Sequence, residues 1–180
     1  SLILSGMLAG GACAEDGTIT FTGTVEDGTC AISTGTKAID VDFGSIATVG
    51  ATASFSSPSI QKRFNIVLED CPASVSNAII TWQGSSANTG DAMLLNAKDA
   101  DGNLFAYATG ATWAIARGDQ VSDTDSAKNL VKFDGTPGTP VPLVPGDNTL
   151  VYTALMVGWD GVSLAAGEIT GDATYSVSYN

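Results

Sequence analysis

Apolar and polar residues alternate with a period of two along most of this chain. The pattern is longest over residues 61–71, 148–159 and 171–180. Shorter stretches with strand-like composition cover residues 37–46, 77–84, 91–97, 103–108 and 111–118. No window shows a convincing helical period of 3.6 residues, so the sequence predicts a nearly all-β protein.

Turn-forming residues separate these stretches about every ten residues, a spacing typical of an antiparallel sandwich of the immunoglobulin type. Asp101-Gly102 predicts a hairpin turn between residues 91–97 and 103–108. Cys71 is one residue out of phase with the face that carries Phe64 and Leu68. We therefore expect a bulge or a strand end at Cys71. Periodicity alone does not determine the order of the strands.

One further alternating stretch lies near the start of the chain, over residues 15–25. Its apolar face carries Ile19, Phe21 and Val25 together with Gly23, and threonines occupy the other face. Alternation predicts an extended strand with two unlike faces. The pattern itself leaves two interpretations open, because the strand can belong to this protein's own sheet or complete the sheet of another molecule.

Residues 1–14 are apolar and uncharged, and end in the small residues Ala12-Cys13-Ala14. The stretch is too short to span a bilayer. A small-x-small end followed by Glu15-Asp16 is typical of the last part of a secretory signal peptide. A buried strand or helix, or a lipid anchor on Cys13, are the alternatives. We interpret residues 1–14 as a signal-peptide remnant.

Removal of residues 1–14 leaves two cysteines, Cys30 and Cys71. An exported protein folds in an oxidising compartment, where an even pair of cysteines favours a disulfide. The loop that this bridge closes corresponds to roughly 4 kcal/mol in the chain-entropy account. Two unlinked buried thiols are the alternative.

The charge of the chain restricts its partners. The formal net charge is −12 with 7 Lys and Arg, so phosphate groups of nucleic acids or anionic lipids would repel it. The chain has no histidine, which removes histidine-based triads, general bases and metal ligands. We therefore predict no enzyme, no cofactor, no metal site, no nucleic-acid partner and no membrane span.

Several features in order resemble a pilin subunit of the chaperone–usher type, as in type 1 and P fimbriae. They are the early strand with Phe21 and Val25, the strand over residues 64–71 that runs into the second cysteine, Gly167 fourteenth from the end, and the penultimate Tyr179. The resemblance covers residues 15–180. It implies a signal peptide, an N-terminal donor-strand arm over residues 15–27 and a pilin domain over residues 28–180.

The resemblance implies an incomplete immunoglobulin-like sandwich that lacks its last strand. Pilins are a known example of β-strand addition, in which a strand from another chain completes a sheet. In the implied register, Ile19, Phe21 and Val25 fill pockets in the groove of the next subunit, and Gly23 lies where the groove floor is too high for a side chain. Tyr175, Val177 and Tyr179, with Gly167, would form the edge that a periplasmic chaperone recognises.

The implied function is a non-catalytic structural subunit of a bacterial surface pilus for cell adhesion. Such a subunit polymerises with its neighbours by donor-strand exchange, after a periplasmic chaperone delivers it to an outer-membrane usher. The chain would be exported through the periplasm to the cell-surface fimbrium. The alternative is a minor or tip adaptor subunit that binds a host receptor.

Overall fold

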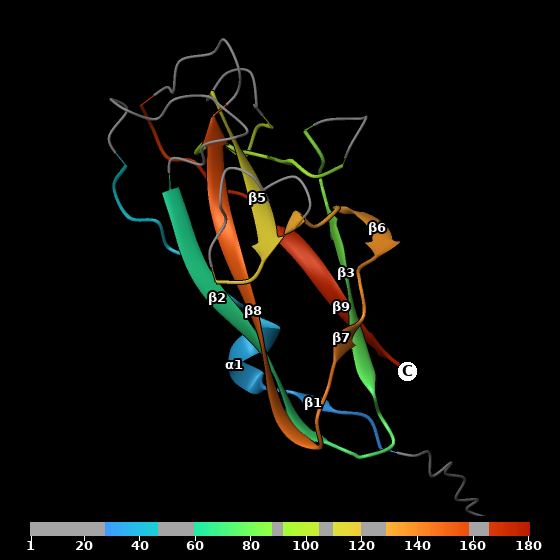
Figure 1. Cartoon of the computed structure of the whole chain (residues 1–180). Coiled ribbons are helices and arrows are strands. Elements are labelled where there is room, and N and C mark those ends of the chain that lie inside the picture. The colour runs from blue at the N-terminus through green and yellow to red at the C-terminus, as the bar shows by residue number, and fades with distance from the viewer. Residues whose placement is uncertain (1–27, 47–59, 88–91, 105–109, 120–128, 159–165) are drawn as a thin grey trace, which may run out of the picture.

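The computed structural model describes residues 28–46, 60–87, 92–104, 110–119, 129–158 and 166–180. Two layers of β-strands face each other, and the single-turn helix lies against one end (Figure 1). The elements are β1 (Ala31–Ile32), α1 (Thr34–Lys37), β2 (Ile60–Cys71), β3 (Asn77–Gly84), β4 (Leu95–Asn96), β5 (Ala111–Arg117), β6 (Asp134–Pro137), β7 (Val141–Pro142), β8 (Gly146–Gly158) and β9 (Ala173–Tyr179).

The larger sheet has the strand order β1-β2-β8-β5-β4, and its neighbours are antiparallel. In the second sheet, β3 is central. It pairs with β9 along residues 78–84 and with the short strands β6 and β7 near its two ends. The arrangement confirms the predicted immunoglobulin-like class. It also supplies the strand order that periodicity left open.

The core lies between the two sheets. β2 contributes Ile66 and Leu68, both with 0% exposure, and β3 contributes Ile80 and Trp82. The Trp82 ring packs against Phe64 of β2 and Tyr152 of β8, with centroids 6.3 and 5.4 Å away. Burial of each large apolar side chain stabilises the fold by roughly 1.5–3 kcal/mol. The alternating residues of β2, β3 and β8 therefore hold the sheets together.

The end of β2 is irregular, as the phase of Cys71 predicted. The β2–β8 register shifts between Leu68 and Cys71, and Asp70 has φ +52°. The backbone N–H of Asp70 donates to Asp147 Oδ1 at 3.1 Å. This bulge turns Cys71 toward Cys30, and the predicted disulfide is present with an S–S distance of 2.08 Å.

The expectation of a strand over residues 37–46 is wrong. α1 ends at Lys37, and residues 38–46 form no strand. Side chains provide the reason. Thr36 is buried, its hydroxyl donates to Ser33 O and accepts from the Val67 N–H, and Asp42 Oδ1 accepts from the Gly44 N–H. Such local bonds offer the backbone an alternative to a sheet ladder.

Two other expected strands need qualification. Only Leu95–Asn96 is a strand within residues 92–97. Residues 105–108 of the stretch 103–108 lie outside the described residues, as does residue 91. The turn between them is confirmed, since the Gly102 N–H donates to Asp99 O at 3.0 Å and Gly102 has φ +81°.

Candidate binding groove

A large groove opens between the two sheets. Its volume is about 1160 Å³. One wall is the irregular segment 38–46, and the other is residues 166–175, which lead into β9. Both sheets contribute apolar side chains between these walls, among them Phe64, Trp82, Leu95, Trp113, Ile115, Phe133 and Met156. The groove, defined by these residues, therefore has an apolar lining, in which Phe64, Trp113 and Ile115 are only partly buried.

β9 is the strand that borders the groove, and its inward side chains are incompletely covered. Tyr175, Val177 and Tyr179 pack against the core but are only half-buried. On the adjacent strand, Ile80 and Trp82 are 3% and 5% exposed. Both strands direct alternate side chains into the same interior. The inward side chains of β9 are more exposed than those of β3 because nothing in the described part of the chain covers the outer side of β9.

The backbone of β9 also has an open edge. Asn77 and Asn180 exchange both of their backbone hydrogen bonds, at 2.9 and 3.1 Å. Hydrogen-bonded and non-hydrogen-bonded pairs alternate along an antiparallel ladder. From the register, Tyr175, Val177 and Tyr179 occupy the non-hydrogen-bonded positions opposite β3. Their N–H and C=O groups face away from β3, where no other strand of the described residues pairs with β9.

Two tyrosines connect β9 to the beginning of the described chain. The Tyr175 hydroxyl donates to Thr36 O at 2.5 Å, and the Tyr179 hydroxyl donates to Cys30 O at 3.4 Å. Burial raises the pKa of both phenols. For Tyr175, the hydrogen bond to Thr36 opposes this rise in pKa. For Tyr179, the nearby Tyr175 raises the pKa further. The phenols therefore remain protonated donors at neutral pH and join β9 to the disulfide and α1.

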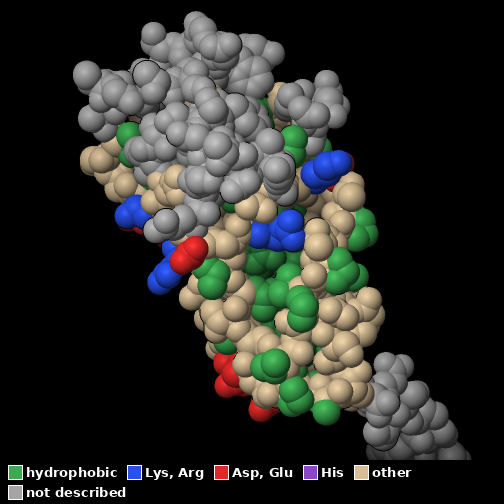
Figure 2. All heavy atoms as spheres, viewed as in Figure 1, with side chains coloured by type: hydrophobic (Ala, Val, Ile, Leu, Met, Phe, Trp, Pro, Cys, Tyr) green, Lys and Arg blue, Asp and Glu red, His purple; other side chains and the backbone are tan. Residues whose placement is uncertain are grey.

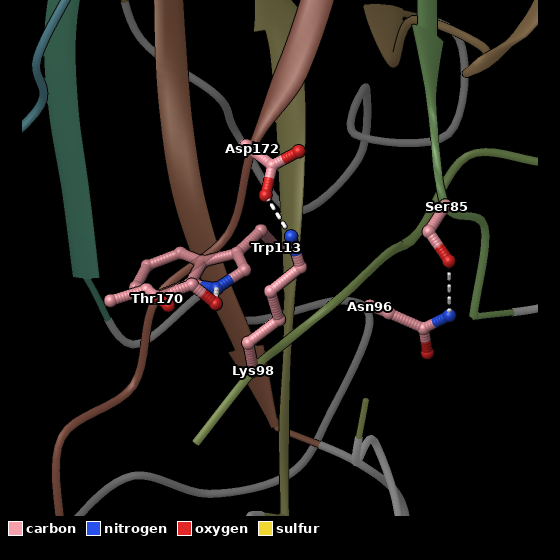
Figure 3. A network of polar contacts seen from close by, with 6 residues as sticks. All are labelled: Ser85, Asn96, Lys98, Trp113, Thr170 and Asp172. Atoms are coloured by element: carbon pink, nitrogen blue, oxygen red, sulfur yellow. Dashed lines mark hydrogen bonds and ion pairs between the residues drawn. The ribbon is translucent and has the colours of Figure 1, made fainter. Parts of the chain in front are cut away.

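Residues around Trp113 line the groove, and Figure 3 shows the polar contacts among them. The indole Nε1–H donates to Thr170 O at 3.0 Å, and Phe43 of the opposite wall lies 5.0 Å from the indole, centroid to centroid. Lys98 forms an ion pair with Asp172, and its backbone exchanges two hydrogen bonds with Thr170. The sequence placed Trp113 only in a short strand-like stretch, because its partner Thr170 lies 57 residues away in the sequence.

The predicted site residues divide into two groups. Gly167 and Tyr175 line the groove, and Val177 and Tyr179 continue along β9. The donor-strand residues Ile19, Phe21, Gly23 and Val25 lie outside the described residues, as do the whole segments 1–14 and 15–27. Sequence reasoning missed the wall over residues 38–46 and the role of Trp113.

The groove has the character of a binding site for an extended peptide. It combines apolar side chains with a row of outward-facing backbone groups, the two elements of β-strand addition. Within the part of the chain that the structure describes, no group of three His, Cys, Asp or Glu residues is placed to hold a metal ion. None of the helices described is long and apolar enough to cross a membrane.

The described strands thus form an immunoglobulin-like sandwich with a groove beside its C-terminal strand. The family profile described as fimbrial protein matches residues 19–180, and the chain belongs to this family. Its fold is that of chaperone–usher pilus subunits, which are structural components of the cell-surface fimbria rather than enzymes.

Individual relatives agree with this assignment. The Fimbria A protein of Serratia marcescens is 30% identical over 174 residues, which cover 96% of this chain and 89% of that protein. The PRS fimbrial major pilin protein of Escherichia coli is 30% identical over 165 residues, 91% of this chain and 94% of that protein. A solved chaperone–usher pilus structure, described for rod uncoiling, has a TM-score of 0.67 at 22% identity and covers 91% of this chain and 95% of its own.

Proposed function

We propose that this chain is a structural pilus subunit whose groove receives an N-terminal strand from another subunit. The observation that supports this most directly is β9, with half-buried inward side chains and backbone groups that face an unpaired edge of the described sheet. An unsatisfied buried backbone group costs about 1–3 kcal/mol. A donated strand would satisfy this edge and cover the apolar groove in one step.

The proposed donor is the arm over residues 15–27. Ile19, Phe21 and Val25 would enter the groove, and Gly23 would pass the part of the floor with no room for a side chain. Each large side chain would contribute roughly 1.5–3 kcal/mol through burial. The threonines on the other face suit a solvent-exposed surface. The proposed donor strand would therefore have an apolar face for the groove and a polar face for solvent.

The same edge also supports the proposed partners during export. A periplasmic chaperone would pair with Tyr175, Val177 and Tyr179 until a neighbouring arm replaces it, and an outer-membrane usher would organise the exchange. The name of the 30% identical PRS relative, a fimbrial major pilin protein, supports a rod-forming role. A minor or tip adaptor subunit that binds a host receptor stays the alternative.

A synthetic peptide of residues 15–27 tests the proposed exchange. A ligand that binds only the folded state raises its melting temperature by mass action. We expect a large rise in the melting temperature of the full chain, and no rise with the Gly23→Trp peptide. The matched control is the Thr22→Trp peptide, whose bulky residue would point to solvent and leave the rise intact. Equal effects of all three peptides would contradict the proposed register.

A further inference from the structure

The sheet that contains β9 has a second edge, on the other side of β3. β6 and β7 form this edge, in which Pro137 lies opposite Thr81 and Pro142 lies opposite Asn77. The chain has 6 prolines, and most of them follow this edge. They are Pro137, Pro140, Pro142 and Pro145, and all of these are exposed. Figure 2 shows hydrophobic side chains, a class that includes proline, on the side of the molecule where β6 and β7 lie in Figure 1.

The hydrogen bonds to β3 determine which way each residue of this edge faces. Gly138 and Leu143 direct their N–H groups toward β3, and donate at 3.1 and 2.9 Å to the carbonyls of Ile80 and of the residue before β3. Backbone groups of successive strand residues point to opposite sides. The preceding residues, Pro137 and Pro142, therefore have their backbone nitrogens on the outer side. Because proline has no N–H, both positions lack the donor that an added strand needs.

Side chains occupy two further N–H groups of the same segment. The Thr136 N–H donates to Asp134 Oδ1 at 2.9 Å, and the Val144 N–H donates to Asn148 Oδ1 at 2.9 Å. The Asn148 side-chain amide also donates to the carbonyl of Val144 at 2.8 Å. These N–H groups are therefore not free to bond to an incoming strand.

The other residues of the segment complete the account of its donors. Val141 lies opposite Ala78 and two positions before an inward N–H, so its own N–H also faces β3. The other two prolines have no N–H. Within residues 136–145, all of which the structure describes, Thr139 is therefore the one residue whose N–H is neither absent, nor bonded to a side chain, nor directed at β3.

The opposite edge of the sheet differs. Tyr175, Val177 and Tyr179 of β9 all carry outward N–H groups in the register with β3. A strand that adds to a sheet bonds to such groups. Prolines on an edge strand are one way in which proteins prevent such pairing. The two edges of one sheet thus have opposite properties toward an incoming strand.

We propose that the β6–β7 edge is protected against strand addition, and that β9 is the one edge of this sheet that accepts a strand. The protection is a property of residues 134–145 and does not depend on the function proposed above. Its consequence for assembly does rest on that function: each subunit would receive a single donated strand in this sheet, so joined subunits would form a fibre without branches at this edge.

The test introduces the missing N–H groups with the double variant Pro137→Thr and Pro142→Thr of the full chain. Threonine is favourable in strands. We expect self-association, measured by sedimentation velocity, at a concentration at least roughly tenfold below that of the wild type, because hydrogen bonds between two such edges add to the affinity. Pro72→Thr is the matched control, since Pro72 lies between β2 and β3 and pairs with neither β6 nor β7. It should associate as the wild type does.

All samples contain an excess of the peptide of residues 15–27, which separates this test from that of the proposed function. The response of the wild type to the peptide tests the groove. The difference between the double variant and the wild type tests the protected edge, whether or not the peptide binds.

Hydrogen exchange identifies the surface involved. Protection of the amides introduced at positions 137 and 142, increasing with protein concentration, would support the proposal. A folded double variant that associates no more than Pro72→Thr would overturn it, as would a wild-type chain that binds a second copy of the peptide along residues 134–145. If the double variant does not fold, each single variant applies the same criterion at one position.

Discussion

At the scale of single residues, Trp113 shows how closely the lining of the groove is packed. A Cβ on Gly171 would lie 2.4 Å from Trp113 Cδ1, and the indole cannot withdraw easily because its Nε1–H is bound to Thr170 O. Gly171 is therefore required by close approach. Its conformation is not the reason, since it lacks a positive φ.

Gly171→Ala should destabilise the domain by about 1–3 kcal/mol, the range for overpacking of a close contact. The change should be measured as the free energy of unfolding in denaturant. Gly35→Ala is the control, because a Cβ there would meet nothing within 4 Å and a helix favours alanine. Equal stability of the two variants would contradict the packing at this end of the groove.

A second residue-scale prediction concerns Tyr152. Burial raises its pKa to about 12, and the charge of Arg117 opposes that effect. The phenol therefore keeps its proton to higher pH in the folded state than in the unfolded chain, where the pKa of tyrosine is about 10. Its contribution to stability is complete below the unfolded pKa and is lost as the pH rises from about 10 to about 12.

The free energy of unfolding, measured across this alkaline range, should fall less steeply for Tyr152→Phe than for the wild type. Absorbance at the phenolate band reports the ionisation directly. Tyr175→Phe is a useful comparison, because the pKa of Tyr175 is also raised by burial and its loss should remove a different part of the slope. An unchanged slope in Tyr152→Phe would contradict the burial of this phenol.

At the scale of elements, the disulfide joins the residue before β1 to the end of β2, and the two cysteines are 41 positions apart in the sequence. The same region holds the carbonyls of Cys30 and Thr36 that accept from Tyr179 and Tyr175 of β9. The bridge thus stabilises the region that supports the edge strand of the groove.

Replacing both cysteines, Cys30→Ser and Cys71→Ser together, should cost about 2–5 kcal/mol of stability, as loss of a native disulfide does in small secreted domains. Denaturant unfolding with and without reductant measures it. The double variant should no longer respond to reductant. Full stability in the variant would show that the bridge contributes nothing to the described fold.

The predictability of each element follows from the range of its interactions. β2, β8 and β9 were evident from alternation, and β3 and β5 from their strand-like composition. The bulge before Cys71 was predictable because Cys71 is one residue out of phase with the alternating face of β2, and a bulge corrects such a shift locally. Residues 38–46 alternate equally well but form no strand, and the side chains of Thr36 and Asp42 form local hydrogen bonds with Ser33 O and the Gly44 N–H instead.

The groove was predictable only in part, for the same reason. Tyr175, Val177 and Tyr179 were predicted as one edge through the family resemblance. Trp113, Phe43 and Thr170 meet only because three segments far apart in sequence converge. No local pattern encodes such a meeting, so this part of the groove lining required the structure.

At the scale of the whole molecule, the sandwich is an unfinished unit. Its core is covered by two sheets of described strands except along β9, where a groove of about 1160 Å³ lies between residues 38–46 and 166–175. In the function that we propose, each donated strand would cover the groove of its neighbour, so a fibre of such units would gain stability at each joint. Assembly and completion of the fold would then be the same event.

Hydrogen exchange on the full chain, with and without the peptide of residues 15–27, tests this claim most directly. The amides of Tyr175, Val177 and Tyr179 face the open edge in the register of β9 with β3. We predict that these three amides become strongly protected when the peptide binds, whereas those of Ser176 and Ser178, which face β3, change little. Unchanged exchange at the three outward amides, with protection elsewhere or nowhere, would contradict the account.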